Sequence, residues 1–266
     1  MRISKYSYYL RSIIKLITEF DKPLLMIQVF TGSYRKSPYN IRLRQSGLSL
    51  AVRGATDIWS VKETFLDRFY ERCGMAVQDS WNVIDIGAGI GDYAILAGFG
   101  HPKNRVFAYE PFEESFMLMK KNLETNQITN VTPFKEAVAG KSGFITLDLS
   151  QGDALKIKSR VSEGESSSAA GSVLCLSLEE VLSRSGLAGC DLLKMDCEGA
   201  EYEILFNTPA AVLKTIRRIV MEYHDGVTNY SHTDLSAYLI QNGFKVQIIP
   251  NDVHAEIGYL YAQVLP

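Results

Sequence analysis

Short apolar segments alternate with amphipathic segments from about residue 82 to the end of the chain. The apolar segments have the length of strands, and the segments between them carry apolar residues at helical spacing. The predicted strands are 82–86, 105–109, 131–135, 191–195, 218–223, 244–249 and 258–264. The predicted helices are 91–99, 113–125, 177–185, 199–206, 209–215 and 233–241. Repeated strand–helix units predict an α/β fold with a mainly parallel sheet covered on both faces.

The first 55 residues follow a different pattern, and we predict that 1–55 forms an extension of an α/β domain at 56–266. Residues 1–35 are predicted to be helical. The alternation of apolar and polar residues in 40–52, around Ser46-Gly47, predicts a β-hairpin.

Three further segments complete the prediction of secondary structure. The segment 57–73 has apolar residues at helical spacing and is predicted to be a helix. The sequence GFITLDL, residues 143–149, predicts an extra strand. The Ser- and Gly-rich segment 150–172 predicts a loop or an excursion at the edge of the domain.

Charge is unevenly distributed along the chain. Residues 1–53 contain ten Lys or Arg and two acidic residues, a charge of +8, and the net charge of −2 leaves −10 for the rest. Such asymmetry indicates an anionic partner, such as a phosphate-bearing sugar donor, a lipid-linked glycan or an anionic membrane surface. A plain solvated surface is the alternative.

Two features of the chain indicate the cellular compartment of the protein. Charged residues interrupt the apolar residues near the N-terminus, so no signal peptide is predicted. The four cysteines lack metal-ligand spacing, which fits a reducing compartment. We expect a cytoplasmic protein that can contact a membrane peripherally.

The sequence VIDIGAGIGDYA follows a predicted strand and begins a helix, which is typical of a cofactor-binding loop. Its glycines do not have the G-x-G-x-x-G spacing of dinucleotide folds, which disfavours a nicotinamide oxidoreductase. Asp85 would repel a pyrophosphate but would attract a cationic amino acid group. S-adenosylmethionine has a sulfonium, an ammonium and no phosphate, and we expect it to be bound by Asp85, Gly87, Ala88, Gly89 and Gly91.

Later strand ends extend this predicted cofactor site. Glu110 lies 19 residues after Gly91, where an acidic side chain accepts hydrogen bonds from the ribose hydroxyls of an adenosine, and Pro111 follows it. Beyond the third strand, Glu136 would meet the adenine amino group, and Ala137 would let the backbone approach the ring.

Two further strand ends provide candidate catalytic groups. A reaction at a hydroxyl needs a base that removes its proton. Asp196 and His224 are the candidate bases, and the choice between them stays open. Glu198 would orient the substrate or hold the loop, and Asp196 would also lie beside the cofactor's methyl group. A Mg²⁺ or Mn²⁺ site at Asp196, Glu222 and His224 is an alternative, but no short ligand motif supports it, so we predict no metal.

Several segments together resemble the FkbM-type S-adenosylmethionine-dependent methyltransferases. They are VIDIGAGIGDYA, AYEPFEESFMLMKKNLETN, EAVAG, LLKMDCEGAEYEIL and IVMEYH, within about residues 56–264. The most specific element is K-x-D-x-E-G-A-E, which here comprises Lys194, Asp196, Glu198, Gly199, Ala200 and Glu201. The chain departs from the family at Cys197, where an aliphatic residue is more usual, and in the length of 150–172.

The resemblance implies a Rossmann-like class I methyltransferase fold, with a seven-stranded, mainly parallel sheet whose last strand is antiparallel. It also implies O-methylation of a hydroxyl on a sugar, glycan or related natural product. Three alternatives are a non-catalytic cofactor-binding scaffold, a nicotinamide oxidoreductase and a nucleic-acid methyltransferase. The acidic body and the absence of an RNA-module motif disfavour the last of these.

Overall fold

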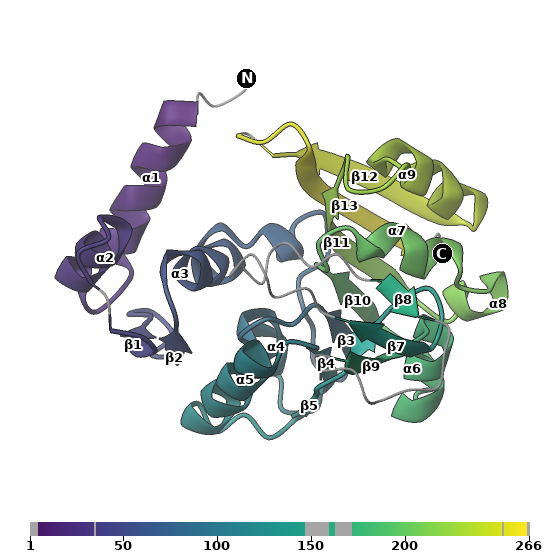
Figure 1. The fold of residues 1–266 in the computed structure, drawn as a ribbon, viewed down its shortest axis with the longest axis horizontal. Helices are drawn as coiled ribbons and strands as arrows, with labels where there is room; N and C mark the ends of the chain where they lie inside the picture. The colour runs from purple at the N-terminus through teal and green to yellow at the C-terminus, as the bar shows by residue number, and fades with distance from the viewer. Residues whose placement is uncertain (1–4, 35, 147–159, 163–171, 252, 265–266) are drawn as a thin grey trace.

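The computed structural model describes residues 5–34, 36–146, 160–162, 172–251 and 253–264. At its centre is a seven-stranded sheet with strand order β12-β13-β11-β10-β3-β4-β5 (Figure 1). Its strands are β3 (Asn82–Ile86), β4 (Arg105–Tyr109), β5 (Val131–Phe134), β10 (Leu192–Met195), β11 (Arg218–His224), β12 (Phe244–Pro250) and β13 (Ile257–Val264). Only β13 is antiparallel to its neighbours, β11 and β12. The predicted sheet, including its antiparallel last strand, is confirmed.

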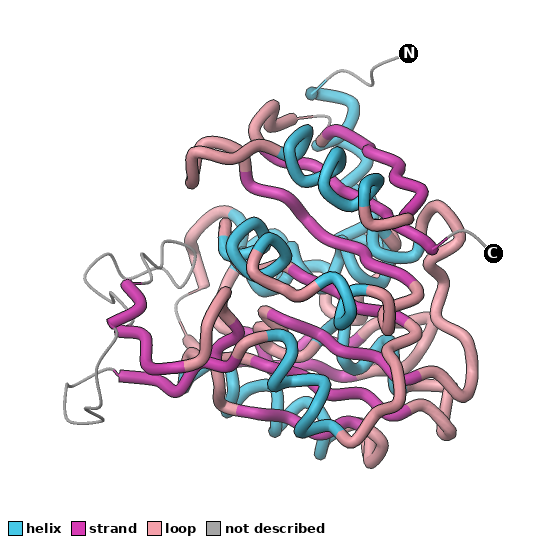
Figure 2. The backbone as a smooth tube through the Cα atoms, turned by 90° about the vertical axis from the view of Figure 1, so that its right-hand side faces the viewer, coloured by secondary structure: helices cyan, strands magenta, loops and turns pink. Residues whose placement is uncertain are grey.

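Helices cover both faces of this sheet (Figures 1 and 2). They are α4 (Asp92–Gly98), α5 (Glu113–Thr125), α6 (Leu178–Ser185), α7 (Ala200–Phe206), α8 (Ala210–Leu213) and α9 (His232–Gln241). Successive strand residues alternate between two apolar clusters: Val83 packs on the side of α4 and α5, and Ile84 on the side of α6 to α9. Every face of the central strands is therefore buried, which explains their nearly continuous apolar sequences.

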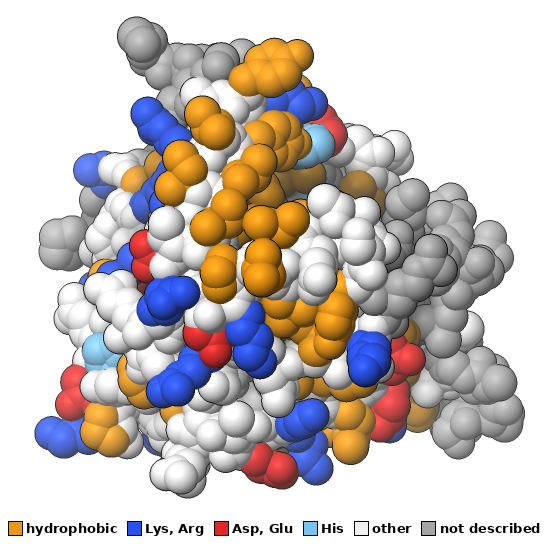
Figure 3. Space-filling model, turned by 90° about the vertical axis from the view of Figure 1, so that its left-hand side faces the viewer, with side chains coloured by type: hydrophobic (Ala, Val, Ile, Leu, Met, Phe, Trp, Pro, Cys, Tyr) orange, Lys and Arg blue, Asp and Glu red, His pale blue; other side chains and the backbone are white. Residues whose placement is uncertain are grey.

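The N-terminal section consists of α1 (Lys5–Thr18), α2 (Pro23–Phe30) and an antiparallel hairpin of β1 (Tyr39–Arg42) and β2 (Ser49–Val52). The predicted helices and hairpin are confirmed. Asn122 of α5 accepts a hydrogen bond from the Ala51 N–H at 2.6 Å, and Leu16 and Phe20 belong to the same apolar cluster as Val83. Most apolar side chains of α1 and α2 nevertheless face outward, on the side shown in Figure 3.

The segment 57–73 is not one helix as predicted. It contains α3 (Ala55–Lys62), a π-helical turn at Glu63–Asp67 and a 3₁₀ turn at Phe69–Glu71. Arg68 separates the two turns with a left-handed backbone, φ 51°, which ends the helix. The chain then turns toward the sheet, where Tyr261 Oη donates to the Phe69 carbonyl at 2.7 Å.

A smaller sheet with the order β6-β9-β7-β8 lies beside the main one. Its strands are β6 (Ala137–Val138), β7 (Gly143–Thr146), β8 (Arg160–Ser162) and β9 (Ser172–Leu176). The extra strand predicted at 143–149 is confirmed as far as Thr146. Its last residues, and most of the loop predicted at 150–172, lie outside the described residues. In the described part of the chain, no helix is long and apolar enough to cross a membrane.

Candidate active site

A cavity of about 440 Å³ opens at the carboxyl ends of β3, β4 and β10. The chain runs from β3 to β4 and β5 in one direction across the sheet, whereas β10 and β11 lie on the other side of β3. Ligands of open α/β sheets bind at this change of direction. Eight of the predicted site residues line the cavity: Gly87, Ala88, Gly89, Glu110, Pro111, Ala137, Asp196 and Glu198. Four do not: Asp85, Gly91, Glu136 and His224.

Gly87 lies where the ends of β3 and β10 approach each other. Its φ is +73°, and a Cβ at this position would lie 1.8 Å from the backbone oxygen of Asp196. Only glycine permits both this backbone conformation and this close approach. The loop that follows β3 is thereby held against Asp196.

Gly89 and Glu110 form the next part of the cavity wall. The Gly89 N–H donates to Glu110 Oε2 at 2.8 Å, and the Phe112 N–H donates to Glu110 Oε1 at 2.9 Å. Burial raises the pKa of Glu110 to about 7, although these two backbone donors act in the opposite direction. A Cβ on Gly89 would meet nothing within 4 Å, so open space lies above this loop. Each carboxylate oxygen of Glu110 retains a lone pair for a further donor.

Asp85 lies below the glycine loop and not in the cavity. Its side chain is fully buried, and Lys194 Nζ lies 3.0 Å from its Oδ1. Lys194 Nζ also donates to the Gly87 carbonyl at 3.0 Å. Burial lowers the pKa of Lys194, but Asp85 and Asp196 outweigh this effect and raise it, so the ion pair persists at neutral pH. Asp85 therefore supports the loop through Lys194, which corrects the prediction of a direct cofactor contact.

Gly91 and Glu136 also take other positions than the sequence predicted. A Cβ on Gly91 would lie 2.7 Å from Cγ of Met119, so this glycine permits close packing of α4 on α5. Glu136 turns toward α6, where its carboxylate lies 3.6 Å from the Arg184 guanidinium. Neither residue reaches the cavity, because each is engaged by a neighbouring helix.

Asp196 lies at the tip of β10 and faces the cavity. Tyr70, in the 3₁₀ turn after Arg68, donates from its hydroxyl to Asp196 Oδ2 at 2.8 Å. The Tyr70 ring is held edge-on by Tyr93 and Tyr259 at centroid distances of 5.4 and 5.7 Å. The carboxylate thus has one fixed oxygen and one that is free to accept a proton from a bound molecule.

His224 ends β11 behind this carboxylate. Its Nδ1 lies 3.4 Å from Glu201, and its Nε2 lies 3.6 Å from Glu198. Burial lowers the pKa of His224, but Glu201, Asp196 and Glu198 outweigh this effect and raise it to about 10. An imidazolium at neutral pH cannot take up a second proton.

Glu201 is fully buried and closes the loop between β10 and α7. Its two oxygens accept the Cys197 and Gly199 N–H groups at 2.7 and 2.8 Å. Glu198, in this loop, has a left-handed φ of 54°, and its side chain lines the cavity. Burial, together with the charge of Asp196, raises the pKa of Glu198 to about 7.

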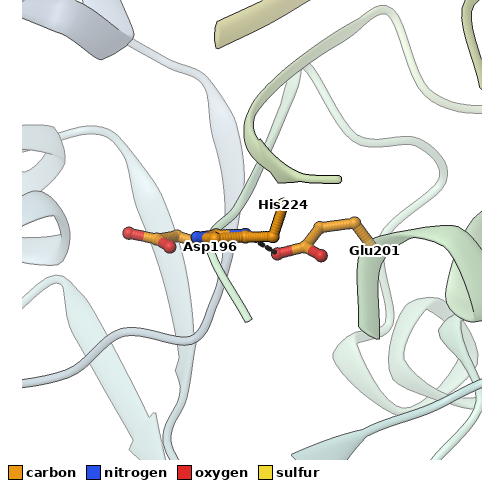
Figure 4. A group of neighbouring side chains, drawn as sticks. All are labelled: Asp196, Glu201 and His224. Carbon is orange, nitrogen blue, oxygen red and sulfur yellow. Dashed lines mark ion pairs between the residues drawn. The ribbon is translucent and has the colours of Figure 1, made fainter. Parts of the chain in front are cut away.

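Asp196, Glu201 and His224 form a candidate metal group, because each offers one ligand atom within 4.8 Å of the others. Glu201 is the third member of this group, where the alternative metal site inferred from the sequence had Glu222. Figure 4 shows His224 between the two carboxylates, in an ion pair with Glu201. Each Glu201 oxygen accepts one backbone donor and keeps a lone pair, so these hydrogen bonds do not exclude a cation. Among the described residues, His224 of this group makes ion pairs with Glu201 and Glu198.

The sequence did not reveal Tyr70 or Arg53 as site residues, although both line the cavity. Tyr70 lies in a segment whose apolar periodicity indicated only a core helix. Arg53 is held by Asp57, which accepts from its Nε and its Nη2 at 2.9 Å. The five-residue sequence from Arg53 to Asp57 was the one signal for this pair, since it permits an i,i+4 ion pair.

A scan against protein families matches residues 85–246 to the methyltransferase FkbM domain. Among curated proteins, the chain is similar to the 31-O-demethyl-FK506 methyltransferase FkbM of Streptomyces tacrolimicus, with 26% identity over 190 residues, 62% of this chain and 73% of that protein. It is also similar to the AMB antimetabolite synthetase AmbE of Pseudomonas aeruginosa PAO1, with 27% identity over 224 residues. This match covers 70% of the chain but only 10% of AmbE.

Solved structures share the fold at low sequence identity. The methyltransferase FkbM from Methylobacillus flagellatus KT has a TM-score of 0.53 and 15% identity, covering 74% of this chain and 47% of that one. A putative rRNA methylase from Clostridium thermocellum has a TM-score of 0.50 and 11% identity, covering 76% and 96%. The fold is that of the class I methyltransferases.

Proposed function

The chain belongs to the FkbM methyltransferase family, and we propose that it transfers a methyl group from S-adenosylmethionine to a hydroxyl of a sugar, a glycan or a related natural product. The observation that carries this proposal is an acidic cavity at the change of strand direction, with Asp196 at its wall. The name of the Streptomyces relative designates a methyltransferase for an oxygen of FK506, which supports a hydroxyl acceptor here.

The charges of the cavity wall fit this methyl donor. The acidic residues that line it are Asp57, Asp92, Glu110, Glu114, Asp196, Glu198 and Glu203. The two basic residues among the described lining, Arg53 and Lys194, are both paired with carboxylates. Such a wall attracts a sulfonium and an ammonium and repels the pyrophosphate of a nicotinamide cofactor.

Glu110 and the glycine loop are the proposed adenosine side of the site. The open space above Gly89 admits a ring against the backbone, and Glu110 has acceptor positions left for the two ribose hydroxyls. Pro111 and Ala137 also line the cavity and provide apolar surface beside these positions.

Asp196 is the proposed general base. Bound S-adenosylmethionine supplies a methyl group activated by a positively charged sulfur. With the donor bound, Asp196 would accept the proton of the acceptor hydroxyl on the oxygen that Tyr70 does not occupy, and the demethylated donor would leave as S-adenosylhomocysteine. A positioned base typically contributes about 10²–10⁴-fold in rate. Glu198, in the adjoining loop, also lines the cavity, and its proposed role is to accept a hydrogen bond from a second hydroxyl of the acceptor.

The proposal is tested first by calorimetric titration with S-adenosylmethionine and S-adenosylhomocysteine. Binding of both, with no binding of reduced nicotinamide dinucleotide, is the expected result. Transfer of a labelled methyl group is then measured with pools of sugars, lipid-linked glycans, polyketides and RNA. Absence of binding to either sulfur compound would refute the proposal, and binding without transfer to any pool would favour a non-catalytic scaffold.

A further inference from the structure

Helices α1 and α2 carry a row of apolar side chains that the fold leaves uncovered. We name these nine residues the outer apolar face: Tyr6, Tyr9, Leu10, Ile13, Ile14, Ile17, Leu24, Ile27 and Phe30, each between 37% and 86% exposed. Figure 3 shows hydrophobic side chains in a band on the side of the molecule where α1 and α2 lie. A band of this size exceeds the scattered apolar residues of ordinary surfaces.

The fold uses this face only at its edge, where the rings of Tyr9 and Phe30 lie 6.2 and 6.4 Å from the Trp59 ring. Helix α1 buries Ser12 and Leu16 on its inner side, where Tyr8 and Lys15 also contact the domain. Its six outer apolar residues follow helical spacing on the opposite side. The helix therefore has two distinct faces, one fixed to the protein by few contacts and one free to contact something else.

Basic side chains accompany the outer apolar face. Lys5, Arg11, Lys22 and Lys36 are exposed, and none makes an ion pair with any residue that the structure describes. The acids of this section are Glu19, which is half-buried, and Asp21, which is exposed. An apolar stripe with basic residues and tyrosines beside it matches the interface of an anionic bilayer, where acyl chains lie under negatively charged headgroups.

We propose that α1 and α2 dock this protein on the surface of an anionic lipid bilayer. A second copy of the chain fits the same face less well, because a twofold contact places each patch opposite its own kind. The unpaired cations of the two patches would then face each other, whereas a bilayer that contains acidic lipids neutralises them. Both helices would lie in the plane of the interface, with their apolar residues among the acyl chains.

Contacts of α1 with neighbouring segments link the outer apolar face to the cavity. Lys15 of α1 forms an ion pair with Asp67 at 2.6 Å, and the Tyr8 ring packs on Trp59 of α3 at a centroid distance of 6.1 Å. Within one turn of Trp59 on α3, Asp57 and Ser60 line the cavity. A bilayer under α1 therefore has a fixed position relative to the candidate active site.

The experiment is co-sedimentation of the full chain with vesicles of phosphatidylcholine, alone or with about a third of phosphatidylserine, at low and high salt. The expected result is binding to the anionic vesicles only, weakened by salt. Ile13→Asp should weaken binding about tenfold or more, because an isoleucine is lost from the acyl-chain side. Arg11→Glu should weaken it by about tenfold, because one attractive charge becomes repulsive.

Matched controls exist elsewhere on the surface. Ile240 on α9 is 57% exposed, against 52% for Ile13, and Lys121 on α5 is exposed in the same way as Arg11. Ile240→Asp and Lys121→Glu should bind vesicles like the wild type, and all four variants should keep wild-type thermal unfolding. Wild-type protein that stays in the supernatant with anionic vesicles would overturn the proposal. Equal losses in the control variants, or a dimer in sedimentation equilibrium that Ile13→Asp dissociates, would overturn it as well.

Discussion

Two regions of the protein use their apolar side chains in opposite ways. One is the set of strand tips at the carboxyl ends of β3, β4 and β10, and the other is the outer apolar face of α1 and α2. In the sheet, apolar side chains are covered on both faces, and the polar groups at the strand tips hold one another. On α1 six apolar side chains are outside, and the inner side buries Leu16 and makes polar contacts through Tyr8 and Lys15. The same amphipathic pattern therefore produces a core in one region and an exposed surface in the other.

Substitutions in the two regions should therefore affect different properties of the protein. A strand-tip residue is tied to its neighbours by backbone contacts, so its replacement should alter activity or stability. A residue of the outer apolar face has few contacts within the protein, so its replacement should alter docking alone. Four changes at the strand tips or in contact with them, each with a reference variant, test this contrast.

Replacement of the proposed base should have the largest effect. Asp196→Asn keeps an oxygen for the Tyr70 hydroxyl but removes the proton acceptor, so kcat should fall by about 10²–10⁴-fold. Binding of S-adenosylhomocysteine, measured by calorimetry, should change little. Asp21→Asn, an identical substitution at an exposed position, serves as the control and should keep full activity. An undiminished kcat in Asp196→Asn would show that another group is the base.

Substitution of the first loop glycine should have the next largest effect. Gly87→Ala combines a left-handed backbone with a clash against the Asp196 carbonyl, so the free energy of unfolding should fall by about 3 kcal/mol or more. Gly89→Ala meets no atom within 4 Å and should cost only about 1 kcal/mol through its backbone conformation. Urea titration of both variants measures the difference. Equal losses would show that the contact between β3 and β10 is not rigid.

Loss of the tyrosine hydroxyl should have a smaller effect. Tyr70→Phe keeps the ring but no longer orients Asp196, so kcat should fall by about tenfold, the consequence of losing roughly one hydrogen bond to a charged group. The KM for S-adenosylmethionine should remain close to that of the wild type. Tyr93→Phe is the matched control, because the Tyr93 hydroxyl has no hydrogen-bond partner among the described residues. Similar losses in both variants would indicate a packing role for Tyr70.

The smallest expected effect is a gradual change of stability with pH, caused by the charge of His224. Its folded pKa is raised from 6.5 to about 10, so the folded state holds this proton more tightly than the unfolded state does. The stabilisation is complete below about pH 6.5 and is lost as pH rises through about 10. The wild type should lose stability between pH 7 and 10, and His224→Gln should lose less. Ile13→Asp should keep the wild-type slope, and equal slopes in wild type and His224→Gln would contradict the ion pair with Glu201.

Local patterns were sufficient to predict most of the fold. The boundaries of β3, β4 and α5 agree with the prediction, because buried parallel strands and amphipathic helices have distinct periodicities. The helix predicted at 57–73 failed because a single left-handed residue, Arg68, divides it. No periodicity reports the φ of one residue, and this turn is the one that brings Tyr70 to Asp196.

The candidate site was predictable in its outline but not in its direct contacts. Glu110 and Asp196 follow strands and were found from that position, and both line the cavity. Asp85 and His224 are also at strand ends, yet Lys194 covers the first and Glu201 engages the second. The position of a residue on its strand predicts which end of the sheet it occupies. It does not predict which neighbouring side chain pairs with it.

The sequence by itself determined the order of strands and helices, the glycine positions, the excess of basic residues before residue 53 and the K-x-D-x-E-G-A-E element. The packing of distant segments decided which carboxylates face the cavity, which of them have a raised pKa and which side of α1 stays exposed. The physical reason is that element formation depends on residues a few positions apart. Burial and pKa depend on groups from distant segments, such as Tyr70 with Asp196, that meet only in the folded chain.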